Sequence, residues 1–213
     1  MSGKVTEIRR TEGDPPRLTV FVDGVEAFTV SEEVARELDL AVGRELAQPT
    51  ADCVAADDER SRAREGALRL LAVRARSEGE LYDRLRRKGF TDELSAAVVA
   101  SLVEVGLLDD EAFARAWADE RVRLRPVGPR RLVQELLSKQ VNRELAGRVV
   151  NETFREHSEF DLARTVLQKK TRVSGGAGDR KSRARLHSFL VRRGFSYEVV
   201  SVVLRELEGE SDA

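Results

Sequence analysis

One short unit recurs three times along the chain, and this repetition constrains the fold more than any other feature. Each copy contains two leucines four residues apart, a basic stretch and then an apolar segment with helical spacing. The leucine pairs are Leu81 and Leu85, Leu132 and Leu136, and Leu186 and Leu190. Successive copies are offset by 51 and 54 residues, a spacing typical of arrays built from one small unit. Such an array buries its apolar faces locally and presents a long outer surface, which favours binding an extended partner over catalysis in one deep pocket.

Helix signals within the copies predict three helices in each. Ser77, followed by Glu80 three residues later, has the pattern of a capping box, in which each side chain bonds a free backbone N–H. Gly89 is suited to follow a helix end, because glycine tolerates the left-handed conformation. Asp109 is a suitable N-cap for the next copy, and Pro129 fits the first turn of a helix. The second copy has Gln140 in place of the glycine, so we expect that helix end to differ.

Residues 4–30 instead show the alternation of β-strands. Asp23-Gly24 separates two alternating segments, and this pair favours a two-residue hairpin because both turn positions need a positive φ. Ser31 is then a good N-cap for a short helix that stops near Gly43. Pro49 and the acidic residues 57–59 are typical of a connector between this unit and the helical copies.

We therefore predict a mainly α protein with three tandem three-helix repeats in an elongated, curved array, preceded by a small β-hairpin plus helix unit. The expected domains are residues 1–48 for the N-terminal unit, 54–107 for repeat 1, 108–156 for repeat 2, 157–208 for repeat 3 and 209–213 for a frayed tail. Residues 174–178 are rich in glycine, which predicts a mobile loop within repeat 3.

Basic charge follows the repeats. The net charge of the whole chain is only −1, but residues 60–88 carry +6, residues 121–148 carry +6 and residues 166–193 carry +8. Two interpretations of these blocks are open. They form either a solvated surface held by salt bridges or a segmented basic face directed at a polyanion or an acidic protein groove.

Catalytic and metal-dependent functions find little support in the residues. His157 and His187 are the only histidines, and neither has the spacing of a metal ligand relative to the other or to Cys53. Cys53 is the single cysteine, so an intrachain disulfide is excluded, and no nearby histidine could activate it as a nucleophile. The sequence has no apolar run long enough to cross a membrane and no secretion signal. We therefore expect a cytoplasmic protein that is not an enzyme and needs no cofactor.

Two strings of residues, in this order, resemble the RecX family of bacterial regulators of the RecA recombinase. They are Arg76-Ser77-Glu78-Gly79-Glu80-Leu81 and Gly106-Leu107-Leu108-Asp109-Asp110-Glu111-Ala112-Phe113-Ala114, and Gly128-Pro129 with Leu132 and Leu136 continues the pattern. The resemblance covers residues 60–207 and is strongest over 67–137. It implies a modulator, in most members an inhibitor, that binds in the groove of the RecA filament on single-stranded DNA. There it lowers ATP hydrolysis and strand exchange and promotes filament disassembly.

Arginines on the repeat surfaces are the candidate contacts, because a guanidinium group suits both carboxylates and phosphates. The candidates are Arg84, Arg86, Arg87 and Lys88 in copy one, Arg121, Arg123, Arg125, Arg130 and Arg131 in copy two, and Arg183, Arg185, Arg192 and Arg193 in copy three. For any single one of them, a solvated helix face is the alternative interpretation. We expect a monomer that binds the RecA filament and, more weakly, single- or double-stranded DNA. An alternative function is that of a DNA-binding protein whose three-helix units act like helix-turn-helix readers.

Overall fold

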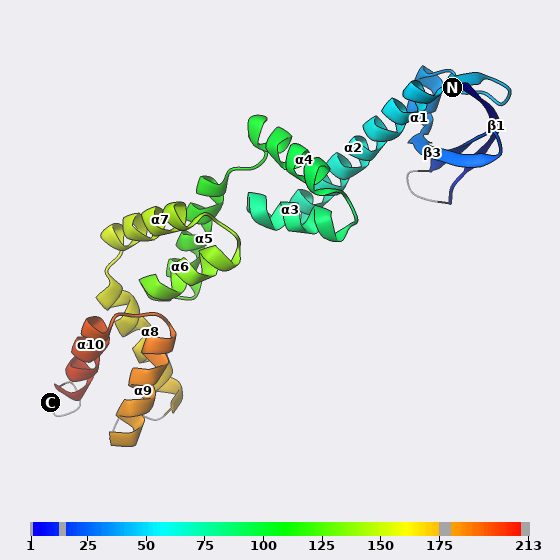
Figure 1. Ribbon diagram of the computed structural model, residues 1–213. Coiled ribbons are helices and arrows are strands. Elements are labelled where there is room, and N and C mark those ends of the chain that lie inside the picture. Colours follow the sequence, from blue (N-terminus) through cyan, green and yellow to red (C-terminus); the bar gives the residue numbers. More distant parts are fainter. Residues whose placement is uncertain (1, 13–15, 175–179, 210–213) are drawn as a thin grey trace. The chain divides into compact units, whose positions relative to one another are not determined.

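The computed structural model describes residues 2–12, 16–174 and 180–209, which form four strands and ten helices in the order shown in Figure 1. Contacts divide the chain into two compact units, Met1–Val73 with Leu85–Ala100, and Arg74–Arg84 with Ser101–Ala213. The element order confirms a mainly α protein in which a small antiparallel sheet precedes the helical repeats.

An antiparallel sheet forms the N-terminal part of the chain. Its strands are β1 (Ser2–Arg10), β2 (Arg17–Val22), β3 (Val25–Ser31) and β4 (Glu45–Ala47), in the spatial order β3-β2-β1-β4. The predicted hairpin between β2 and β3 is confirmed, because Asp23 and Gly24 have φ angles of 51° and 82°. Strand β4 was not predicted, since its three residues are too few to show an alternating pattern.

Two helices follow and accompany this sheet. Helix α1 (Glu32–Glu37) begins as predicted, with the Val34 N–H donating to Ser31 Oγ at 3.2 Å, but it ends well before Gly43. Helix α2 (Gln48–Val73) is continuous over 26 residues, so the connector predicted at Pro49 and residues 57–59 was wrong. Asp58 is buried on this helix and forms an ion pair with Arg17 of β2. A buried carboxylate is tolerated there because its charge is compensated by that distant partner.

The repeats share one pattern of burial. Their helices are α3 (Glu78–Arg87) and α4 (Asp92–Glu104) after α2; α5 (Asp110–Leu124), α6 (Pro129–Ser138) and α7 (Arg143–Glu156) in repeat 2; and α8 (Glu159–Ser174), α9 (Arg180–Arg192) and α10 (Tyr197–Gly209) in repeat 3. All six repeated leucines are buried, as are Val98, Val149 and Val203 at matching positions of the third helices. Repeats 2 and 3 have separate apolar clusters, which agrees with the prediction of locally buried cores.

Helix boundaries follow the predicted signals, with one correction. The Glu80 N–H donates to Ser77 Oγ at 3.1 Å, and the Ala112 N–H donates to Asp109 Oδ1 at 2.9 Å. In every repeat, a residue with positive φ lies two positions after the end of the second helix: 94° at Gly89, 63° at Gln140 and 85° at Gly194. The expectation that Gln140 would change its helix end was therefore wrong. Gln140 Nε2 donates to Asp83 Oδ2 at 2.5 Å, a contact that helps to offset the cost of a side chain in the left-handed region.

Two predicted segments fall largely outside the described residues. Ser174 and Gly209 are the last residues of α8 and α10. The remainder of the predicted loop at 174–178 and of the predicted tail at 209–213 lies outside the part of the chain that the structure describes.

Candidate functional site

A basic pocket lies where repeat 2 meets repeat 3, and we call it the junction pocket. It has two adjoining lobes of about 390 and 490 Å³. Both lobes are lined by Arg125, Phe189 and Arg193. The remaining lining residues are Leu124, Pro126, Val166, Lys169 and Lys170 in one lobe and Arg121, Val127, Arg131, Glu135 and Arg192 in the other. Cations from two successive repeats therefore converge on one depression.

Two glycines allow the repeats to approach closely enough to form this pocket. The Gly128 N–H donates to the Arg193 carbonyl at 2.8 Å, and Arg193 Nη1 donates to the Pro126 carbonyl at 3.0 Å. A Cβ added to Gly128 would lie 2.2 Å from the carbonyl carbon and oxygen of Gly194. A Cβ added to Gly194 would lie 2.3 Å from the backbone nitrogen of Arg131. Both distances are far below van der Waals contact, so the backbones can meet here only without side chains.

Glu135 is the only acid among the described residues that line the pocket, and it orders part of the basic wall. It accepts from Arg121 Nε at 2.6 Å, from Arg131 Nε at 3.0 Å and from Trp117 Nε1 at 3.4 Å. Burial alone raises the pKa of Glu135, but the hydrogen bond and charge of Arg121 and the hydrogen bonds of Arg131 and Trp117 outweigh it and lower this pKa below its ordinary value. Glu135 is therefore ionised at neutral pH and fixes two guanidinium groups in place.

Three further cations of the pocket are available to a ligand. Arg125, Lys169 and Arg192 are exposed and take part in no ion pair within the described part of the chain. Half-buried Phe189 has the guanidinium carbon of Arg193 at 5.1 Å and Lys170 Nζ at 5.7 Å from its ring centre. Several cations beside one carboxylate and one aromatic ring suit an anionic partner, either a carboxylate or a phosphate.

The structure brings together five of the predicted contact residues. Arg121, Arg125, Arg131, Arg192 and Arg193 line the junction pocket. The predicted residues that do not line it are Arg84, Arg86, Arg87, Lys88, Arg123, Arg130, Arg183 and Arg185, all of them exposed.

Two of the residues outside the pocket have notable neighbours. Arg130 lies 5.7 Å from the ring centre of Tyr197, which belongs to repeat 3. Arg86 forms an ion pair with Asp92 and donates to the Phe90 carbonyl, so part of its bonding capacity is used within its own turn.

Sequence reasoning missed Lys169, Lys170, Phe189 and Glu135 as residues of the pocket. The two lysines fall within the third basic block, which was the available signal for them. Phe189 could not be recognised as a pocket residue from the sequence. An aromatic residue beside the repeated leucines has the same helical spacing as a residue of the core.

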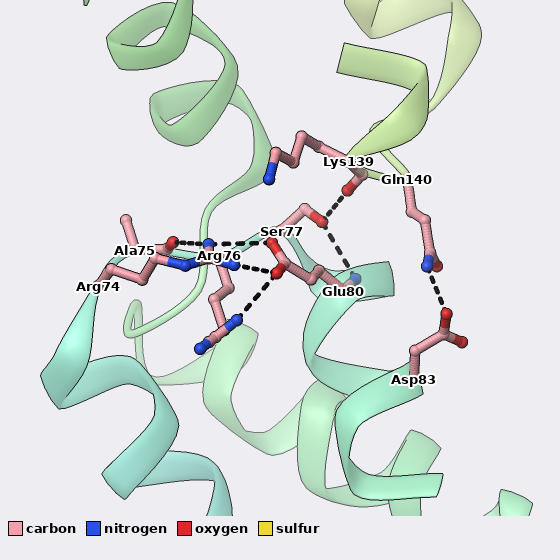
Figure 2. Close-up of polar contacts among 8 residues, drawn as sticks. All are labelled: Arg74, Ala75, Arg76, Ser77, Glu80, Asp83, Lys139 and Gln140. Atoms are coloured by element: carbon pink, nitrogen blue, oxygen red, sulfur yellow. Dashed lines mark hydrogen bonds and ion pairs between the residues drawn. The ribbon is translucent and has the colours of Figure 1, made fainter. Parts of the chain in front are cut away.

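A second cluster of charged side chains has a structural role (Figure 2). The Arg76 side chain is buried and donates to Glu80 Oε1 at 2.8 Å, and Glu80 also pairs with Arg74. Burial raises the pKa of Glu80, but Arg74, Lys139 and Arg76 together lower it below its ordinary value. Arg76 is therefore bonded within its own repeat.

Neither a metal centre nor a membrane-spanning helix is found in the described ranges. Histidine, cysteine and acidic side chains in residues 2–12, 16–174 and 180–209 form no group of three that could hold a metal ion. In the same part of the chain, no helix combines the length and the apolar character needed to cross a bilayer.

Comparison with known families identifies the three helical units. Residues 63–102, 109–149 and 157–204 match the first, second and third three-helix domains of RecX. The chain belongs to the RecX family. The regulatory protein RecX of Amycolatopsis mediterranei is 35% identical over 159 residues, which are 73% of this chain and 90% of that protein. The regulatory protein RecX of Mycolicibacterium smegmatis is 38% identical over 160 residues, which are 70% of this chain and 85% of that protein.

The fold is shared with a solved RecX structure. The crystal structure of a regulatory protein RecX covers 94% of this chain and 98% of its own, with a TM-score of 0.66 and 22% identity. At this level of identity, the similarity supports the RecX fold of the chain alone. It does not indicate which residues contact a partner.

Proposed function

We propose that this RecX-family chain regulates the RecA recombinase by binding, as a monomer, in the groove of the RecA filament on single-stranded DNA, and that its effect is inhibition. The observation that carries the proposal is the junction pocket, in which cations of two successive repeats converge around a single carboxylate. A protein filament on DNA presents carboxylates and phosphates at regular intervals. Membership of a family of regulatory proteins supports a regulatory outcome of this binding.

The repeats explain how modest contacts could give tight binding. Arg125 and Arg192 form no ion pair with a described residue, and contacts through several repeats of one chain act at high effective concentration. A chain held along the groove in this way would oppose the movements of protomers that accompany ATP hydrolysis. We therefore infer lower ATPase activity, slower strand exchange and faster filament disassembly.

The experiment that tests this proposal is a titration of RecA ATPase activity on single-stranded DNA. The wild-type chain is compared with the double variant Arg125→Glu/Arg192→Glu, which reverses two free charges of the pocket. The control is Arg155→Glu/Arg205→Glu, because these arginines are also exposed, lie on repeats 2 and 3, and do not line the pocket. We expect the pocket variant to need about tenfold more protein for half-inhibition, the loss typical of important interface residues.

Two results would count against the proposal. A wild-type chain that leaves RecA ATPase activity unchanged at saturation contradicts the regulatory function itself. Equal potency of the two double variants removes the junction pocket from the contact surface.

Direct binding of DNA is a second candidate function, favoured by the cations around Phe189. An aromatic ring beside basic groups can stack a base while the cations hold the backbone. Binding of a single-stranded oligonucleotide without RecA, measured across salt concentrations, tests this candidate. Tight binding that weakens steeply with salt and is reduced by Phe189→Ala would support it. Weak binding that is indifferent to Phe189→Ala would exclude it.

A further inference from the structure

The second helices of successive repeats meet head to tail at two places within the Arg74–Arg84 and Ser101–Ala213 unit. In both, a donor at the start of one helix bonds a carbonyl at the end of another. In the first contact, the Ser77 hydroxyl at the start of α3 donates to the Lys139 carbonyl at the end of α6 (Figure 2). In the second contact, the Gly128 N–H at the start of α6 donates to the Arg193 carbonyl at the end of α9. A helix N-terminus thus meets a helix C-terminal turn, which also aligns their dipoles favourably.

The partners in these two contacts occupy equivalent positions of the repeat. Ser77 and Gly128 each lie four residues before the first repeated leucine, and Lys139 and Arg193 each lie three residues after the second. Close approach is part of the geometry in both places. A Cβ added to Gly79 would lie 2.6 Å from the Gln140 Cβ, just as Gly128 and Gly194 leave no room for a Cβ at the other contact.

A third turn of the same kind is present but uncovered. Lys88-Gly89-Phe90, which we call the open turn, follows α3 as Lys139 to Val141 follows α6. Gly89 has the same left-handed backbone, with φ of 94°, and a Cβ there would meet nothing within 4 Å. Lys88 and Gly89 are exposed, and the Lys88 carbonyl accepts no hydrogen bond from any described residue. Val141 and Phe195 are buried, whereas the equivalent Phe90 is only half-buried.

We propose that the open turn binds the first turn of a helix on the protein partner of this chain, which rests on the proposed function that this partner is the RecA filament. The two filled contacts define the chemistry that fits. The helix begins with serine or glycine, as in both filled contacts, and can approach the Lys88 carbonyl closely. Arg131 stands three residues after Gly128, but beside Lys88 a carboxylate at that place has the favourable charge. Glu80 has that place in the contact with α6, where its charge interacts with Lys139, the equivalent of Lys88.

A second copy of the chain is a poor occupant of the open turn. The one second helix whose start is not engaged in these two contacts is α9, and its first residues include Lys181 and Arg183. Those charges would approach Arg86, Arg87 and Lys88, so like charges oppose the contact. An acidic helix start on another protein has the complementary charge.

The test compares two glycine variants with the same backbone conformation. Gly89→Asn adds a side chain at the open turn. The contact of α3 with α6 accommodates Gln140 at the equivalent position only because Gly79 faces it without a side chain. Asparagine tolerates positive φ better than most residues. Gly106→Asn is the matched control, because Gly106 also has positive φ, ends the helix α4 and has nothing within 4 Å of an added Cβ. Binding of each full-length variant to the RecA filament on single-stranded DNA is measured by titration. Lys88→Glu and Lys88→Arg test the charge in the same assay.

We expect Gly89→Asn and Lys88→Glu to weaken binding by at least about fivefold, while Gly106→Asn and Lys88→Arg bind like the wild type. Circular dichroism should show the same helical content in all four. Wild-type binding that Gly89→Asn and Lys88→Glu leave unchanged would overturn the inference and leave the proposed function standing. A wild type that does not bind the filament would overturn both.

Discussion

The guanidinium of Arg121 donates to Glu135 at 2.6 Å while lying 4.3 Å from the ring centre of Trp117. Arg121 and Trp117 join the wall of the junction pocket to the core of repeat 2. The Trp117 ring also stacks on buried Phe113, with 6.1 Å between the ring centres. Trp117 is the only tryptophan of the chain, so its fluorescence reports on this pocket directly.

Replacing Glu135 with glutamine should lower stability in a way that depends on pH. The variant Glu135→Gln weakens two charge-assisted hydrogen bonds at a partly solvated position, so the free energy of unfolding at pH 7 should fall by about 1–2 kcal/mol. Because the folded-state pKa of Glu135 is lowered, its stabilisation is present above the ordinary glutamate value of 4.5 and is lost as pH falls below it. Urea unfolding followed by Trp117 fluorescence between pH 3 and pH 7 measures the difference. A difference in unfolding free energy that stays constant from pH 3 to pH 7 would contradict a lowered pKa of Glu135.

The contact between repeats 2 and 3 should fail when Gly128 gains a side chain. Gly128→Ala places a methyl group against the Gly194 carbonyl, and relief of this overlap should cost roughly 1–3 kcal/mol. Hydrogen exchange of the residue 128 amide reports the loss, because that N–H donates to the Arg193 carbonyl. Gly147→Ala is the control: Gly147 lies within α7 and has nothing within 4 Å of an added Cβ, so this change should stabilise by about 0.5–1 kcal/mol. Unaltered exchange in Gly128→Ala would show that the repeats do not meet at this glycine.

Because repeats 2 and 3 have separate cores, a substitution in one core should destabilise that repeat more than the other. Leu190→Ala removes a fully buried side chain from repeat 3 and should cost about 2–5 kcal/mol there. Trp117 lies in the cluster of repeat 2, so its fluorescence transition should move less than the loss of helix measured by circular dichroism. Leu136→Ala should instead shift the Trp117 transition strongly. Coincident transitions in Leu190→Ala would mean that the two repeats unfold as one unit.

The ion pair between Arg17 and Asp58 should hold α2 against the sheet. Asp58→Ala leaves a largely buried guanidinium without its partner, and we expect a loss of roughly 2–4 kcal/mol in the N-terminal unit. Asp58→Asn keeps an acceptor oxygen and should lose less. Scanning calorimetry of the two variants and the wild type gives the comparison. Equal melting temperatures of Asp58→Ala and the wild type would contradict a structural role for the pair.

Local signals in the sequence were sufficient for much of the fold. Asp23-Gly24 determined the hairpin through its positive φ angles, and Ser77 and Asp109 marked helix starts through bonds to nearby N–H groups. The errors came from distant interactions. Residues 57–59 resembled a connector because the burial of Asp58 depends on Arg17, 41 positions away in the sequence.

The candidate site shows the same limit. The arginines of copies two and three were predicted as a set, but their charges alone could not indicate which would meet. Arg121 and Arg131 are brought to Arg193 by the close approach of Gly128 and Gly194, which depends on the absence of side chains. Gln140 was misjudged for a related reason, since its contact with Asp83 comes from another repeat.

The acceptors at both filled contacts are main-chain oxygens, those of Lys139 and Arg193. No exchange of either side chain can abolish such an acceptor, whereas deleting a single residue from the turn would rotate it away from its donor. Substitutions at Lys139 or Arg193 would therefore not reveal these acceptors, whereas one-residue deletions in the two turns would.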